Sequence, residues 1–464
     1  MNSSITFRRT GFRAAALSLV VGGLAATLVP QSAAALSEAE SSAEYSAGYR
    51  IDHVVYWNRV LLDAFRQAGG TPGPISRGGA ITNIAIYDAV NSIRPTGKPY
   101  LTQVTEGRGI QGALESAIDQ AAYTALKGAF PKQNFDEKYK QAVAQEVGGS
   151  TWERELGRSI GTKTANAIVA ARVGDGSDDV TPYVGVDEPG HWRATPGSAA
   201  TPGTPNWGKV KPFSLTSGSQ FRPTGILGYT NAKDFLASDE YAKGIDEVKR
   251  IGGKNSTERT ADQTQIAHYW ANDLNGTYKP VGQEYDHTIT VYESGQRYVD
   301  STRSAKLFAL VSISLADASI AVWDSKFDSN WDLWRPESAI NLADTDGNDK
   351  TVADPNWRPL SQDVNGNSFS PAFPSYVSGH SGIVGAWAGA MQSFYGRDDI
   401  AFTGGTDDPL AVGVKRSFTS FSQAAQEKAD SRLYAGVHFR WDNDAALKLG
   451  YQVAGYVSAN TFNQ

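Results

Sequence analysis

Two histidines in the C-terminal half of the chain stand in short stretches whose residue types could do chemistry. His380 lies in Ser378-Gly379-His380, and His438 ends a second stretch, SRLYAGVH, six positions after Arg432. The whole chain contains only six histidines and no cysteine. An imidazole can act as a nucleophile, a metal ligand or a proton carrier, because its ordinary pKa is about 6.5. Without cysteine there is no thiol nucleophile and no thiolate metal site.

A third stretch, WDSKFDSNWDLWRP, supplies two cations, Lys326 and Arg335, with eight residues between them. Arg432 is a third cation. Gly379 has no Cβ, so its N–H can approach a ligand closely, and a helix beginning at Ser378 would direct free N–H groups toward the same ligand. Lysine and arginine bind oxyanions through charge-assisted hydrogen bonds. Together, the three stretches predict a site for phosphate or a phosphate-like oxyanion.

Each stretch also has an ordinary structural interpretation. An SGH sequence is common in turns, Arg-Pro often ends a loop, and the histidine of GVHF could be a packed or capping residue. Among the other histidines, His53, His268 and His287 are interpreted as structural and His191 as a surface residue. The acidic stretch at 344–350 is interpreted as a turn rather than a calcium loop, because its glycine and terminal acid do not match an EF-hand. The oxyanion site is favoured because three complementary stretches occur in one chain.

The elements that position these residues are predicted to be helices. Apolar residues recur with a period near 3.6 over 51–65, 76–93, 110–128, 134–146, 152–172, 232–250, 299–323, 378–396 and 442–462. Thr260 and Gln263 fit a capping box, and Asp442 or Asn443 is expected to cap the last helix. Residues 174–230 are rich in Gly and Pro with interleaved Trp and Phe, which predicts an ordered, irregular surface excursion. The fold is predicted to be all-α, with helical bundles sharing one core.

The first 35 residues are predicted to be an export signal, which leaves residues 36–464 as the mature helical domain. Arg8, Arg9 and Arg13 precede a short apolar run that glycines interrupt, and Ala33–Ala35 fits a cleavage site. FRRTGF resembles a twin-arginine signal, with general secretion as the alternative. Without these arginines the formal charge changes from −6 to −9, which disfavours a nucleic-acid partner. No later run of about 18 apolar residues predicts a membrane span, so a secreted protein is expected.

The three stretches resemble the active-site motifs of the vanadium-dependent haloperoxidases, and of the related type 2 phosphatidic acid phosphatases and bacterial acid phosphatases. The family pattern is Lys-x6-Arg-Pro, then Pro-Ser-Gly-His, then Ser-Arg-x5-His. Here the third motif is complete from Ser431 to His438, and the second has Val377 in place of proline. All three motifs lie within residues 323–442. The first, in the stretch 323–336, has eight residues between its lysine and its arginine, two more than the family pattern.

Further matches support this resemblance and the choice of Lys326. Trp323-x-x-Lys326 has the spacing of chloroperoxidase-like enzymes, whereas Lys306 and Lys350 lie outside the motif. NIAIYDAVNSI, and YWAND ending at Asp273, are similar to the bacterial branch of the family.

The resemblance implies a helical-bundle fold and a vanadate cofactor, with His438 as the ligand of vanadium. It also implies that the vanadate oxygens are bound by Lys326, Arg335, Ser378, Gly379 and Arg432. His380 would exchange a proton with the apical oxygen, and Lys326 would assist catalysis. Asp273 would pair with Arg432, and Trp323 and Phe373 would line a halide pocket.

Three functions remain open for such a site. A haloperoxidase would use hydrogen peroxide to oxidise bromide, and chloride too, to hypohalous acid. An acid phosphatase would use His438 to attack phosphorus and His380 to protonate the leaving alcohol. A non-catalytic protein would only bind the oxyanion. Trp323, Phe373, the length of the chain and the near absence of oxidisable sulfur favour the haloperoxidase. The organic substrate, the halide preference and a homo-oligomeric state are left open.

Overall fold

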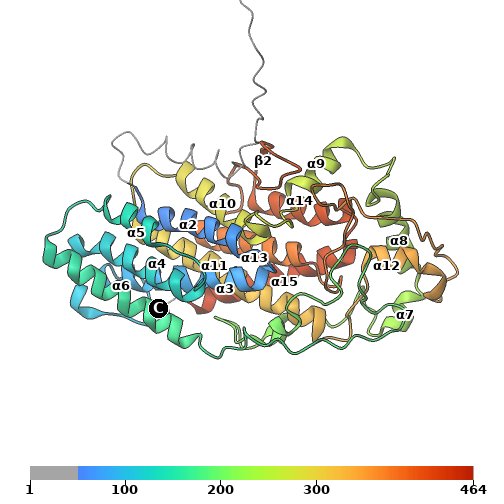
Figure 1. Ribbon diagram of the computed structural model, residues 1–464, viewed down its shortest axis with the longest axis horizontal. Helices are drawn as coiled ribbons and strands as arrows, with labels where there is room; N and C mark the ends of the chain where they lie inside the picture. The colour runs from blue at the N-terminus through green and yellow to red at the C-terminus, as the bar shows by residue number, and fades with distance from the viewer. Residues whose placement is uncertain (1–50, 463–464) are drawn as a thin grey trace, which may run out of the picture. The chain divides into compact units, whose positions relative to one another are not determined.

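Helices form most of the regular structure in the computed structural model, which describes residues 51–462 (Figure 1). The predicted export signal at 1–35 lies outside the described residues. The α-helices are α2 (His53–Ala68), α3 (Pro72–Ile93), α4 (Leu114–Ala129), α5 (Asp136–Val143), α6 (Thr151–Ala171), α7 (Ala232–Leu236), α8 (Asp239–Ile251), α9 (Ala261–Tyr269), α10 (Lys279–Ser294), α11 (Ser301–Phe327), α12 (Pro336–Asn341), α13 (Gly379–Tyr395), α14 (Phe421–Tyr434) and α15 (Arg440–Asn460).

Short elements complete the described part of the chain. Its 3₁₀ helices are η1 (Thr105–Gly107), η2 (Gln111–Ala113), η3 (Pro205–Lys209), η4 (Gly218–Phe221) and η5 (Ala343–Thr345). Strands β1 (Phe402–Gly404) and β2 (Arg416–Phe418) form one antiparallel pair, with Phe402 opposite Phe418. The predicted all-α fold is confirmed.

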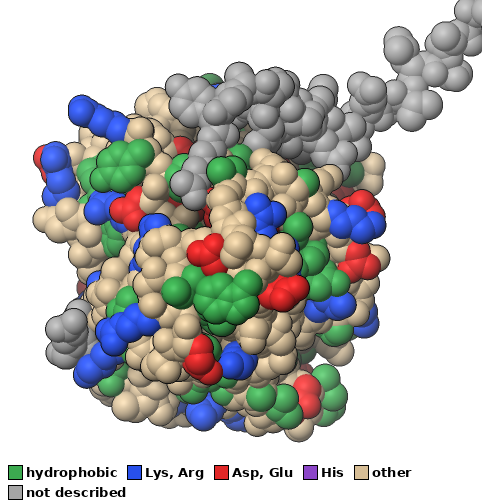
Figure 2. Space-filling model, turned by 90° about the vertical axis from the view of Figure 1, so that its left-hand side faces the viewer, with side chains coloured by type: hydrophobic (Ala, Val, Ile, Leu, Met, Phe, Trp, Pro, Cys, Tyr) green, Lys and Arg blue, Asp and Glu red, His purple; other side chains and the backbone are tan. Residues whose placement is uncertain are grey.

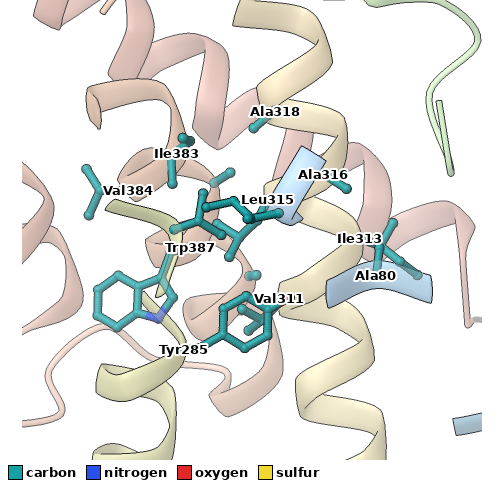
Figure 3. Close-up of a cluster of buried hydrophobic side chains, with 14 of the residues drawn as sticks. Ala80, Tyr285, Val311, Ile313, Leu315, Ala316, Ala318, Ile383, Val384 and Trp387 are labelled. Atoms are coloured by element: carbon teal, nitrogen blue, oxygen red, sulfur yellow. The ribbon is translucent and has the colours of Figure 1, made fainter. Parts of the chain in front are cut away.

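Helix α11 lies in the middle of the core, where it packs against α3, α13 and α15. Its side chains are buried on all sides, because apolar residues surround the helix rather than forming one stripe. Figure 3 shows Val311 and Leu315 of α11 on the side of Trp387 of α13 and Tyr285 of α10, and Ile313 of α11 on the other side, near Ala80 of α3. Among the described residues, α11 is long and apolar enough to cross a membrane. However, 94% of its most apolar window is buried inside the protein, as in a core helix.

Helices α13 and α15 run side by side in the same direction, with their backbones almost in contact. A Cβ added at Gly385 would lie 2.6 Å from the Leu447 carbonyl oxygen, and one added at Gly450 would lie 2.2 Å from the Gly382 oxygen. Only glycine permits so close an approach. The contact brings together the N-terminal ends of the two helices, which are the ends that carry His380 and follow His438.

Residues 174–230 form the irregular segment, which in the structure contains only η3 and η4. Asp317 of α11 anchors it, because its buried carboxylate accepts hydrogen bonds from the backbone N–H groups of Phe213, Ser214 and Leu215 at 2.6, 2.7 and 2.9 Å. Trp192 donates its backbone N–H to the Asp332 carbonyl oxygen at 2.7 Å. The segment is therefore attached both to the core and to the loop that leads to Arg335.

Several expected boundaries differ in the structure. Residues 232–250 form two helices rather than one, because Ser238 caps a new helix through its side chain. The last helix begins at Arg440, so Asp442 and Asn443 lie inside its first turn rather than before it. The capping box of Thr260 and Gln263 is confirmed. Helices α10 and α14 had no predicted counterpart.

The face in Figure 2, on the side where Figure 1 places α4, α5 and α6, carries acidic, basic and hydrophobic side chains interspersed with one another. Neither sign of charge gathers into a broad patch on this face.

Candidate active site

The structure brings the three predicted stretches together at the ends of helices. Lys326 lies in the last turn of α11, and Arg335 is the residue that precedes α12. Arg432 lies in the last turn of α14, and His438 stands in the short loop before α15. His380 occupies the first turn of α13. All five side chains are buried.

Lys326 reaches this site despite the longer spacing of its motif. Its Nζ donates hydrogen bonds to the carbonyl oxygens of Pro374 and Ser375, at 2.6 and 3.1 Å. Arg335 donates from Nε to the adjacent carbonyl of Phe373 at 2.8 Å. The two cations therefore bind consecutive carbonyls of one segment, and residues 328–334 loop out between them.

Arg335 also fixes one ring nitrogen of His438. Its Nη1 donates to the Val437 carbonyl oxygen at 2.8 Å and lies 3.1 Å from Nε2 of His438. A guanidinium can only donate, so Nε2 accepts and the proton of the neutral imidazole is on Nδ1. Nη2 of Arg335 is buried and has no partner within the protein.

Two residues that sequence analysis did not assign to the site hold the other side of the His438 ring. The Nδ1 proton points to Oδ2 of Asp442 at 3.0 Å, and the Ser375 hydroxyl donates to the same oxygen. Asp442 had been expected only as a helix cap, and its carboxylate does accept the backbone N–H of Phe439 at 3.0 Å. The spacing His438-x-x-x-Asp442 was the available signal, whereas the sequence around Ser375 carries none.

Arg432 is oriented by Asp273, the partner that the resemblance implied. Nη2 of Arg432 donates to Oδ2 of Asp273 at 2.8 Å, while Nε and Nη1 of Arg432 are buried without a partner. Nε2 of His380 lies 2.9 Å from the carbonyl oxygen of Ala271 and 3.8 Å from Oδ1 of Asp273. The loop that carries Asp273 thus contacts both Arg432 and His380.

Left-handed backbone at two non-glycine residues shapes this loop. Asn272 has φ 46° and Lys279 has φ 61°, conformations that cost energy for residues with a Cβ. Hydrogen bonds compensate this cost. Asn272 donates its N–H to Asp408 at 2.9 Å, and Nζ of Lys279 donates to the carbonyl oxygens of Asp273 and Leu274.

The N-terminus of α13 presents Ser378 and Gly379 to the same region. The Ser378 hydroxyl is the side-chain cap of α13, and it also accepts a hydrogen bond from the Ser381 hydroxyl at 3.0 Å. A Cβ at Gly379 would meet the Trp323 ring at 3.7 Å, an ordinary contact. Packing within the protein alone therefore does not require glycine at 379.

Trp323 and Phe373 form an aromatic wall, with ring centroids 5.1 Å apart. Nζ of Lys326 lies 5.2 Å and the Arg335 guanidinium carbon 4.8 Å from the centre of the Phe373 ring. The indole N–H of Trp323 donates to the Gly203 carbonyl oxygen at 3.1 Å. The irregular segment thus covers the outer side of this wall.

A cavity borders the Asp273–Arg432 pair. Its lining includes polar residues, Asp273, Arg432, Asp408, His268, Ser361 and Gln362, and apolar residues, Ala267, Ala271, Leu274, Leu360, Phe369, Leu410 and Ala435.

Burial and neighbouring charge favour the neutral form of the bases at this site. The pKa of His438 is lowered well below its ordinary value by burial first, and then by Arg335, Lys326 and Arg432. The pKa of His380 is also lowered, by burial first and then by the charge of Arg432. Burial also lowers the pKa of Lys326, with Arg335 adding to the effect. An anion between these groups would offset this excess of positive charge.

The donors fit an oxyanion better than a metal cation. Three guanidinium nitrogens, Nη2 of Arg335 and Nε and Nη1 of Arg432, are buried without partners, and the charges of both arginines act on His438. Arginine N–H groups match tetrahedral oxyanions in geometry and charge. Within residues 51–462 no cluster of three or more His, Asp or Glu side chains is arranged to hold a metal ion. Vanadate, an oxyanion that needs one histidine ligand, suits this set of donors.

Comparison with known proteins agrees with this architecture. Residues 306–463 match the second helical-bundle domain of the vanadium chloroperoxidase family. The chain is 27% identical to the vanadium chloroperoxidase of Curvularia inaequalis over 497 aligned positions, which cover 86% of this chain and 80% of that protein.

Solved structures show the same fold. A bacterial vanadium-dependent iodoperoxidase matches with a TM-score of 0.71 at 24% identity, over 88% of this chain and 98% of its own. The apo form of a bacterial vanadium-dependent chloroperoxidase matches with a TM-score of 0.65 at 18% identity, over 84% and 93%. The predicted resemblance to the vanadium haloperoxidases is confirmed by these matches.

Proposed function

We propose that this protein is a vanadate-dependent haloperoxidase that uses hydrogen peroxide to oxidise bromide, and chloride as well, to hypohalous acid. One observation carries the proposal. Three unpartnered guanidinium nitrogens of Arg335 and Arg432 and the unprotonated Nε2 of His438 are buried in this site. Leaving such donors unpaired costs free energy, and an oxyanion bound between them would supply the missing acceptors.

In this proposal His438 would bind vanadium through Nε2, while Asp442 holds the proton on Nδ1 and so keeps Nε2 unprotonated. Arg335, Arg432, Lys326, the Ser378 hydroxyl and the Gly379 N–H would bind the oxygens of the vanadate and neutralise their charge. Bound vanadate would supply a Lewis-acidic vanadium(V) centre that activates peroxide without redox cycling. His380, held low in pKa by burial and Arg432, is a neutral base that accepts the peroxide proton.

Trp323 and Phe373 are proposed to bound the halide position. Both rings lie against Lys326, whose charge would attract a halide to this side of the site. The small cavity beside Asp273 and Arg432 is proposed to admit hydrogen peroxide and halide. Oxidation of chloride, which is harder than that of bromide, would support the role of Phe373.

An acid phosphatase with a phosphohistidine intermediate is the second candidate, because the same side chains would serve it. Nε2 of His438 would attack phosphorus, the cations would stabilise the transition state, and His380 would protonate the leaving alcohol. The aromatic wall of Trp323 and Phe373 favours the haloperoxidase, since a phosphate ester has no need of aromatic rings beside the lysine. A non-catalytic oxyanion-binding protein is the third candidate.

Two variants separate these functions. His438→Ala removes the vanadium ligand, so vanadate binding, measured by equilibrium dialysis, and bromide oxidation should both be lost. His380→Ala should keep vanadate binding and lose at least about 100-fold in bromide oxidation, since general base catalysis contributes on this scale. A His380→Ala variant with full bromide oxidation would contradict the proposal.

We also propose that the protein is exported through residues 1–35. The arginines and the apolar run of that segment support this proposal. N-terminal sequencing of protein collected from the culture medium tests it, with a start directly after Ala35 expected.

A further inference from the structure

Ser375 makes three separate connections at the centre of the site. Its carbonyl oxygen accepts a hydrogen bond from Nζ of Lys326 at 3.1 Å, and its N–H donates to the Leu333 carbonyl oxygen at 2.8 Å. Its hydroxyl donates to Oδ2 of Asp442 and lies 3.4 Å from Nδ1 of His438. The first two connections use the backbone, so only the third depends on the side chain.

The Asp442 carboxylate is held by one of its two oxygens. Oδ2 receives the Ser375 hydroxyl, the Nδ1 proton of His438 and the Phe439 N–H, whereas Oδ1 is buried with no partner. Ser375 is the donor to Oδ2 that lies farthest away in the sequence, because Phe439 and His438 belong to the chain just before Asp442. The hydroxyl therefore ties the carboxylate to the segment that binds Lys326 and Arg335.

We propose that Ser375 is a positioning residue of this site, whose hydroxyl holds the Asp442 carboxylate where it orients the His438 ring toward the bound oxyanion. This inference rests on the proposed function, since it concerns the same histidine. Partners of a metal-ligating histidine commonly matter for affinity, and their loss costs about 10- to 100-fold.

The test compares four variants of the full protein after removal of bound vanadate. Ser375→Ala removes the hydroxyl and leaves both backbone connections. Ser375→Thr and Ser375→Val have nearly the same volume, but only Thr keeps a hydroxyl. Ser314→Ala is the matched control, because Ser314 is fully buried in α11 and bonds only to the Leu310 carbonyl oxygen. Equilibrium dialysis gives the vanadate dissociation constant, and nitrogen NMR of labelled histidines gives the His438 tautomer.

The expected result is about ten-fold weaker vanadate binding in Ser375→Ala and Ser375→Val, with near wild-type binding in Ser375→Thr and Ser314→Ala. The His438 signal should be a pure Nδ1–H tautomer in the wild type and mixed in Ser375→Ala. A space-filling role would lower binding equally in the Thr and Val variants, and that outcome overturns the inference, as does unchanged binding in Ser375→Ala. Failure of the wild type to bind vanadate would instead overturn the proposed function together with this inference.

Discussion

Arg432 and Asp273 meet across 159 positions of the chain, with 2.8 Å between Nη2 and Oδ2. The second carboxylate oxygen of Asp273 lies 3.8 Å from Nε2 of His380. Burial alone would raise the pKa of Asp273, but the charge and the hydrogen bond of Arg432 oppose burial, and the pKa lies below its ordinary value. One ionised carboxylate thus connects an oxyanion-binding cation with the expected proton acceptor.

Replacing Asp273 with alanine should weaken vanadate binding about ten-fold, because Arg432 would lose the partner that aims its free Nε and Nη1. Equilibrium dialysis measures the change. Asp399→Ala is the control, since Asp399 is an exposed partner of Arg397. Equal vanadate affinity in the Asp273 and Asp399 variants would show that Arg432 needs no orientation by a carboxylate.

Replacing Lys326 with methionine should lower vanadate affinity by at least about ten-fold, since it removes a buried cation that contributes to oxyanion binding. Lys306→Met is the matched control. Lys306 belongs to the same helix, but twenty helical positions place it about 30 Å from Lys326. A Lys326→Met or Lys326→Ala protein that binds vanadate and turns over like the parent would refute the role given to this lysine.

Asp317→Ala should destabilise the protein by about 3 kcal/mol, because the backbone N–H groups of residues 213–215 would lose their acceptor. Asp317→Asn keeps one oxygen and should lose less. Urea unfolding gives the free energy, and limited proteolysis should cut the alanine variant within residues 174–230. If Asp317→Ala resists proteolysis as well as the wild type does, the irregular segment is held by other contacts.

Stability should fall in acid partly through His287. Burial first, and the charge of Lys428 second, lower its pKa to about 3, against about 6.5 in the unfolded chain. The unfolded state therefore binds an extra proton between these values, and stability decreases as pH falls from about 6.5 toward 3, by at most about 1.4 kcal/mol per pH unit. His287→Gln should flatten this dependence between pH 7 and 5 in urea unfolding. Parallel curves for both proteins would contradict the prediction.

The sequence predicted the helical fold and the residues of the three motifs, because helix periodicity and motif spacing are local properties. It did not predict α14, whose apolar and polar residues FSQAAQEKADSRLY form no clear stripe. The connection of Ser375 to Asp442 also could not be foreseen, since it spans 67 positions and depends on how α13 and α15 pack. Asp273 was found through family resemblance alone. The two extra residues between Lys326 and Arg335 are explained only by the structure, in which residues 328–334 loop out.

The most direct test of the central claim uses one preparation of the protein, treated with EDTA and divided. One half receives orthovanadate, hydrogen peroxide, bromide and monochlorodimedone, and the other receives p-nitrophenyl phosphate with and without vanadate. The proposed function predicts halogenation that appears only after vanadate is added, and no phosphate-ester hydrolysis above background. Hydrolysis that vanadate abolishes, without halogenation, would contradict it and make His438 a phosphorus nucleophile.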